Sequence, residues 1–191
     1  MRICIYGAGA IGGMLGFLLK KIGADVTLIA RREHYEAVKN NGLTFISQEY
    51  NIDETLKFNI FNSLENLGSF DLVINSLKAH SASQTASIVS SVLNKNSVMI
   101  PTLNGIPWWF FYKFEGMFSD YKLNSVDPDQ NLWNHVGPNR VVGCVVYPAA
   151  TIYKPGVIKH IEGKRFIIGE PDNTKSERVL TISNLLNKAG L

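Results

Sequence analysis

Three glycines near the start of the chain, Gly7, Gly9 and Gly12, have the spacing of a turn that receives a phosphate group. A strand-like run over residues 3–6 precedes them, and an apolar helix to about residue 22 follows. Gly7 permits the tight turn, Gly9 lets the backbone approach a pyrophosphate, and Gly12 lets the helix pack closely on the strand. The alternative is a glycine-rich turn without a ligand. We expect a dinucleotide site whose cofactor-binding residues are Gly7, Ala8, Gly9, Ala10, Ile11 and Gly12.

The residues after the second predicted strand, residues 26–30, indicate which dinucleotide binds. An NAD site normally carries Asp or Glu about 20 residues beyond the glycines, to accept hydrogen bonds from the ribose. Here Arg31 and Arg32 stand at that place, and a guanidinium binds phosphate by charge and by forked hydrogen bonds. We therefore expect NADP(H), with Arg31 as the main contact. Arg32 is either a second contact or a solvated charge at a helix start, with Glu33 as its local partner.

Two more polar residues follow strand-like runs, and ligands of doubly wound folds bind beyond the carboxyl ends of strands. Lys78 follows the apolar run 70–77 and could meet a cofactor phosphate, ribose or substrate carboxylate. Asn104 follows the run 98–101 and could hold a nicotinamide ribose or a substrate hydroxyl. Spacing alone slightly favours the alternatives, which are a solvated lysine and a turn residue beside Gly105.

The elements that position these residues alternate between strand and helix, which predicts an α/β fold with a Rossmann-like doubly wound parallel sheet. Residues 43–46 are predicted as its third strand and residues 81–93 as a helix. Residues 119–139 are predicted as a surface loop, and strands over 140–150, 157–161 and 166–169 as a small antiparallel extension of the sheet. Residues 173–177 can cap a final helix that runs almost to the end of the chain. We divide the chain into a dinucleotide-binding domain, 1–170, and a helix leading to a further domain, 171–191.

The composition is that of an ordinary globular protein, with 46% hydrophobic and 18% charged residues. The net charge of +3 is small and the basic residues are scattered, so we expect no nucleic-acid partner. The apolar stretch 14–19 is too short to span a membrane, and Cys4 and Cys144 suit buried positions in a reducing cytoplasm. The histidines His80, His135 and His160 lack metal-ligand spacing, so no metal is predicted.

Over nearly all its length the sequence resembles the ketopantoate reductases, or 2-dehydropantoate 2-reductases. The resemblance rests on residues 7–13 with Arg31 and on five further segments: 76–79, 103–109, 147–150, 155–160 and 169–172. It implies that Lys78 and Asn104 line the cofactor side of the cleft and that Ala150 offers the cofactor a backbone contact. It also implies reduction of a small 2-keto acid by NADPH, as in pantothenate biosynthesis, in a cytoplasmic enzyme that could form a homodimer.

The resemblance implies as well that the catalytic lysine lies in an all-helical C-terminal domain, which is absent from this chain. Lys188 does not match its Arg-x-x-x-Trp-x-Lys pattern, so we expect no catalytic residue here and no turnover by this chain alone. Two alternatives are a non-catalytic NADP(H)-binding module and a different 2-hydroxy acid dehydrogenase of the same fold.

The aromatic run 108–112 has three interpretations: core packing, a cap on the nicotinamide pocket, or part of a buried interface with the further domain. Without a second domain, Trp108, Trp109, Leu185 and Leu186 would be exposed.

Overall fold

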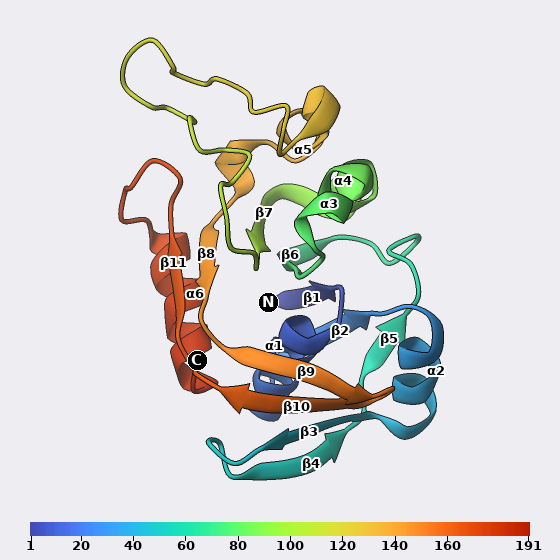
Figure 1. Ribbon diagram of the computed structural model, residues 1–191. Coiled ribbons are helices and arrows are strands. Elements are labelled where there is room, and N and C mark those ends of the chain that lie inside the picture. Colours follow the sequence, from blue (N-terminus) through green and yellow to red (C-terminus); the bar gives the residue numbers. More distant parts are fainter.

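The main sheet is a parallel one with five strands in the order β5-β2-β1-β6-β7 (Figure 1). The computed structural model describes residues 1–191 except the side chain of His80. All four strand pairings in this sheet are parallel, so the doubly wound fold class is confirmed. Its strands are β1 (Arg2–Tyr6), β2 (Asp25–Ile29), β5 (Asn59–Phe61), β6 (Phe70–Asn75) and β7 (Leu93–Pro101).

A second, mixed sheet of four strands lies beside the first. The prediction that residues 43–46 form the third strand of the main sheet is wrong, because β5 pairs with β2 instead. In β3, Leu43 and Phe45 are buried while Thr44 and Ile46 are less so, which suits a sheet with one solvated face. The order is β4-β3-β10-β9, with bounds β3 (Leu43–Ser47), β4 (Ile52–Leu56), β9 (Ala149–Lys154) and β10 (Val157–Glu162).

Helix α1 (Ala10–Lys21) is packed between the two sheets (Figure 1). Glycines let it approach both of them closely. A methyl group at Gly16 would lie 2.7 Å from Leu28 Cδ2 of the main sheet. One at Gly13 would lie 2.9 Å from Ile158 Cγ1 of the second sheet. Residues 157–161 therefore form a layer over α1, and the expectation that they extend the main sheet is wrong.

The other face of the main sheet is covered by the short helices α3 (Ala79–Ala82), α4 (Ala86–Ser90) and α5 (Asn131–His135). A 3-10 turn, Ser83–Thr85, interrupts the single helix predicted over 81–93. Trp108 and Trp109 are buried in this second core, as the core-packing interpretation predicts. Residues 119–139 are not all loop, because Asp127 accepts hydrogen bonds from two backbone N–H groups at the start of α5.

The strands β8 (Gly143–Val146) and β11 (Phe166–Gly169) form an antiparallel pair beside β7, linked to it by isolated parallel bridges. Helix α6 (Glu177–Lys188) follows. Ile182 and Leu186 of α6 are buried in the same core as α1, and Leu185 packs against that core. The expected exposure of Trp108, Trp109, Leu185 and Leu186 is therefore wrong, because the chain itself covers them.

Candidate dinucleotide-binding site

The glycine turn borders a cavity of about 230 Å³ at the carboxyl ends of β1 and β2. The N–H groups of Gly7 and Ala8 donate to the Ile29 carbonyl at 3.1 and 2.8 Å, so the turn is fixed to the end of β2. Gly7 has a φ of +95°, a conformation that side chains rarely adopt. The cavity is lined by Tyr6, Gly7, Ala8, Gly9, Ile29, Ala30, Arg31, His34, Leu77 and Ile152.

Gly9 and Gly12 are glycines for different reasons. A methyl group at Gly12 would lie 2.3 Å from the Gly7 carbonyl oxygen, so the turn cannot form with a side chain there. A methyl group at Gly9 would meet no protein atom within 4 Å. Ala10 and Ile11 begin α1, whose first-turn N–H groups have no partners within the helix. The open space at Gly9 and these free donors fit a pyrophosphate group.

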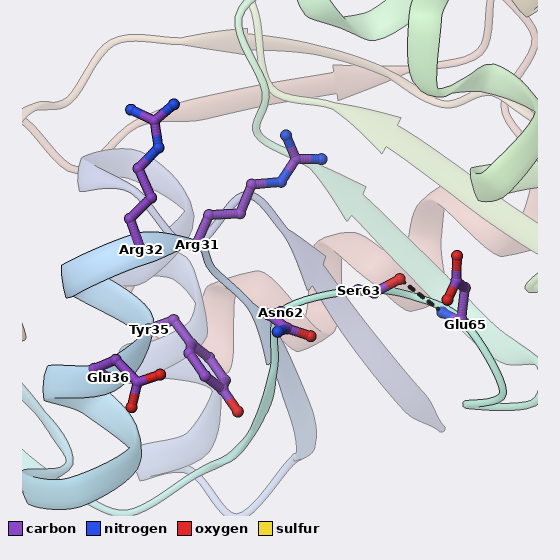
Figure 2. A pocket seen from close by; sticks show the side chains of 7 residues that line it. All are labelled: Arg31, Arg32, Tyr35, Glu36, Asn62, Ser63 and Glu65. Carbon is purple, nitrogen blue, oxygen red and sulfur yellow. Dashed lines mark hydrogen bonds between the residues drawn. The ribbon is translucent and has the colours of Figure 1, made fainter.

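Arg31 borders this cavity and a second one of about 480 Å³. Its Nη2 lies 3.5 Å from the Tyr6 hydroxyl oxygen, at the end of β1. Figure 2 shows Asn62 and Ser63 on the loop after β5, across the second cavity from α2 (Arg32–Asn41). Because both cavities share Arg31, they form adjoining parts of one surface groove. The second cavity is lined by Arg31, Arg32, Tyr35, Glu36, Asn62, Ser63 and Glu65.

Arg32 has an unusual backbone conformation, with a φ of 54°. For a residue with a side chain this conformation costs roughly 1–2 kcal/mol. Figure 2 shows both arginine side chains extending from the start of α2, with their guanidinium groups apart. Among the described residues, neither guanidinium forms an ion pair, so the expected pairing of Arg32 with Glu33 is wrong. Two positive charges without carboxylate partners can attract an anionic ligand.

His34 lines the glycine-turn cavity, although nothing in the sequence singled it out. Its Nδ1 accepts a hydrogen bond from the Gly156 N–H, 122 residues later in the chain. Burial lowers the pKa of His34, and the Ala8 backbone facing the ring opposes this shift. The ring is therefore neutral near pH 7. A histidine three residues after Arg31, near the start of a helix, is too common a pattern to identify a binding residue.

The structure does not bring the other predicted contacts to the glycine turn. Lys78 is exposed at the start of α3, outside the linings of the two cavities. The Asn104 side chain is bonded to the backbone of Val146. Ala150 pairs with His160 inside the second sheet, and its neighbour on the same strand, Ile152, lines the cavity instead. These three contacts stay predictions.

No other chemical centre stands out in the part of the chain that the structure describes. The His80 side chain lies outside it, and the remaining His, Cys, Asp and Glu residues form no group of three that could hold a metal. Burial raises the pKa of Cys4 and of Cys144 to about 12, so both thiols stay protonated. Within the same residues, no helix is long and apolar enough to cross a membrane.

A parallel sheet with a glycine turn leading into α1 defines the class as a Rossmann-like nucleotide-binding domain. Residues 3–107 match the family model described as ketopantoate reductase PanE/ApbA. The chain belongs to this family, as the resemblance predicted.

Comparison with known proteins gives the same family. The chain is 41% identical to the 2-dehydropantoate 2-reductase of Mesorhizobium japonicum, over 100% of this chain and 58% of that protein. It is 33% identical, with a TM-score of 0.92, to the crystal structure of a proposed ketopantoate reductase from Ralstonia solanacearum, over 100% of this chain and 58% of the other. A D-mandelate dehydrogenase bound to NADH and anilino(oxo)acetate shares the fold, with 22% identity and a TM-score of 0.79 over 55% of its chain. The chain thus spans little more than half the length of these relatives.

Proposed function

We propose that this chain is the NADP(H)-binding part of an enzyme that reduces 2-dehydropantoate to pantoate. The observation that carries the proposal is the adjacency of the glycine-turn cavity to the cavity bordered by Arg31 and Arg32. The names of the relatives support the substrate class, because 2-dehydropantoate 2-reductase is the description of the relative that is 41% identical.

Bound NADPH would supply the hydride for this reaction. The N–H groups at the start of α1 would hold its pyrophosphate, and Gly9 leaves room for it. The guanidinium of Arg31, with that of Arg32 beside it, would bind the 2′-phosphate. We assign the proton donor to the part of the relatives that this chain does not cover, and residues 171–191 to the connection with that part.

Cofactor choice is the experiment that tests the proposal, because the NADH-bound relative shares the fold. We would titrate the chain with NADPH and with NADH and follow nicotinamide fluorescence. NADPH is expected to bind at least about tenfold more tightly, which corresponds to about 1.4 kcal/mol. Arg31→Ala should remove this preference and leave NADH binding unchanged.

Lys39→Ala is the matched control, because Lys39 is an exposed cation in the last turn of the same helix and lies outside both cavities. It should preserve the preference for NADPH. Equal affinities of the unmodified chain for the two cofactors, or no loss for NADPH on Arg31→Ala, would contradict the proposal.

A further inference from the structure

His34 connects three separate parts of the fold at the glycine-turn cavity. It belongs to the first turn of α2, and its ring lines the cavity beside Gly7, Ala8 and Gly9. Its Nδ1 accepts the Gly156 N–H at 3.1 Å, in the turn between β9 and β10. The ring therefore lies between an element of the main sheet and an element of the second sheet.

The other ring nitrogen of His34 is buried and has no hydrogen-bond partner in the described part of the chain. Because Nδ1 is an acceptor, a neutral ring carries its proton on Nε2, which is then an unused donor. The Ala8 backbone faces the ring closely enough to oppose the effect of burial on the pKa of His34. An unsatisfied buried donor costs about 1–3 kcal/mol, so a smaller apolar residue would be favoured by stability alone.

We propose that His34 is a positioning residue for the dinucleotide, which holds the glycine turn and the β9–β10 turn at the spacing that the pyrophosphate requires. The lining of the cavity comes from parts of both sheets, with Gly7 to Gly9 after β1 and Ile152 of β9 among its residues. A ring that touches both turns fixes the distance between these parts before the ligand arrives. Preorganised sites bind more tightly because less ordering accompanies binding.

This inference rests on the proposed cofactor function, and the probes are chosen to separate the two. NADPH contains the pyrophosphate, whereas adenosine 2′-monophosphate keeps the ribose and the 2′-phosphate and lacks it. For His34→Ala we expect about tenfold weaker NADPH binding, with a change of no more than about twofold for adenosine 2′-monophosphate. A role limited to stability would lower both affinities together.

Two conservative variants test the two ring nitrogens of His34 separately. In His34→Asn the amide oxygen can accept the Gly156 N–H in place of Nδ1. In His34→Gln the amide nitrogen can place an N–H group where the unpartnered Nε2 lies. We expect each to restore part of the NADPH affinity that His34→Ala loses. His135→Ala is the control, because His135 lies at the end of α5, outside the cavity.

The thermal midpoint of each variant without ligand shows whether it is folded. The inference is overturned if folded His34→Ala binds NADPH as the unmodified chain does. It is also overturned if the two ligands lose affinity equally, or if neither conservative variant restores binding. Failure of the unmodified chain to bind NADPH would instead overturn the proposed function.

Discussion

The side-chain amide of Asn104 forms two hydrogen bonds with the backbone of Val146. Its Nδ2 donates to the Val146 carbonyl at 2.9 Å, and its Oδ1 accepts the Val146 N–H at 3.0 Å. The loop after β7 is thereby joined to the end of β8, 42 residues further along the chain. One hydrogen of the amide remains for a ligand, so Asn104 can still contact a nicotinamide ribose while it holds this loop.

Asn104→Ala is expected to lower the free energy of unfolding by about 1 kcal/mol, because two hydrogen bonds are lost at an exposed position. Urea denaturation followed by circular dichroism measures this change. Asn96→Ala is the control, because Asn96 is exposed in β7 and its side chain forms no hydrogen bond among the described residues. Equal stability of the two variants would show that the Asn104 bonds do not hold the loop in solution.

Gly9→Val and Gly12→Ala should separate ligand binding from folding. Gly9→Val is expected to fold and to lose NADPH binding, because its side chain enters space that no protein atom occupies within 4 Å. Gly12→Ala is expected to destabilise the chain, because its methyl group would collide with the Gly7 carbonyl oxygen at 2.3 Å. Thermal unfolding and NADPH titration distinguish the two results. Undiminished NADPH binding by Gly9→Val would show that the glycine turn is not part of the binding site.

Substitutions of Arg32 should separate its charge from its backbone strain. Arg32→Gly and Arg32→Ala both remove the guanidinium, but only glycine adopts a φ of 54° without strain. We expect the glycine variant to be about 1 kcal/mol more stable than the alanine variant. Both should weaken NADPH binding equally, by up to about fivefold for an exposed charge contact, and leave NADH unchanged. Unchanged NADPH affinity in both variants would show that Arg32 is a solvated charge and does not contact the cofactor.

The ion pair between Glu170 and Arg178 should make stability depend on pH. Burial alone would raise the pKa of Glu170, but hydrogen bonds from Arg178 and Ser176 and the Arg178 charge outweigh it and lower the pKa. A carboxylate whose pKa is lowered in the folded state stabilises the fold at pH values above its ordinary pKa of 4.5. That contribution is lost as the pH falls through the folded-state value.

Glu170→Gln is therefore expected to cost about 1–3 kcal/mol at pH 7 and progressively less below pH 4.5. Denaturant unfolding between neutral and acid pH measures the difference. Glu162→Gln is the control, because Glu162 is exposed in β10 and pairs with no cation in the described part of the chain. A cost for Glu170→Gln that does not change with pH would contradict the assignment.

This chain is expected to bind NADPH without reducing 2-dehydropantoate. General acid catalysis typically contributes about 10² to 10⁴ in rate, and we assign the proton donor to residues beyond this chain. NADPH absorbance would be followed with 2-dehydropantoate for this chain and for a fusion to the remaining part of the Mesorhizobium relative. Comparable rates would show that the catalytic group lies within these residues.

The sequence predicts the glycine turn, the helix after it and the arginines that follow the second strand. These features depend on residues that are close in the chain, where turn geometry and apolar periodicity act locally. It also predicts the parallel sheet, because its buried strands are nearly continuous apolar runs.

Long-range packing sets which strands are neighbours and which side chains meet. Leu43 and Phe45 mark β3 as a strand, and β4 pairs with it from nearby in the chain. Its other partner, β10, begins more than a hundred residues later, and no local pattern specifies that pairing. The same holds for His34 with Gly156 and for Asn104 with Val146. The pairing of β3 with β10 belongs to the sheet that packs on Gly13 of α1, and that packing depends on the whole chain.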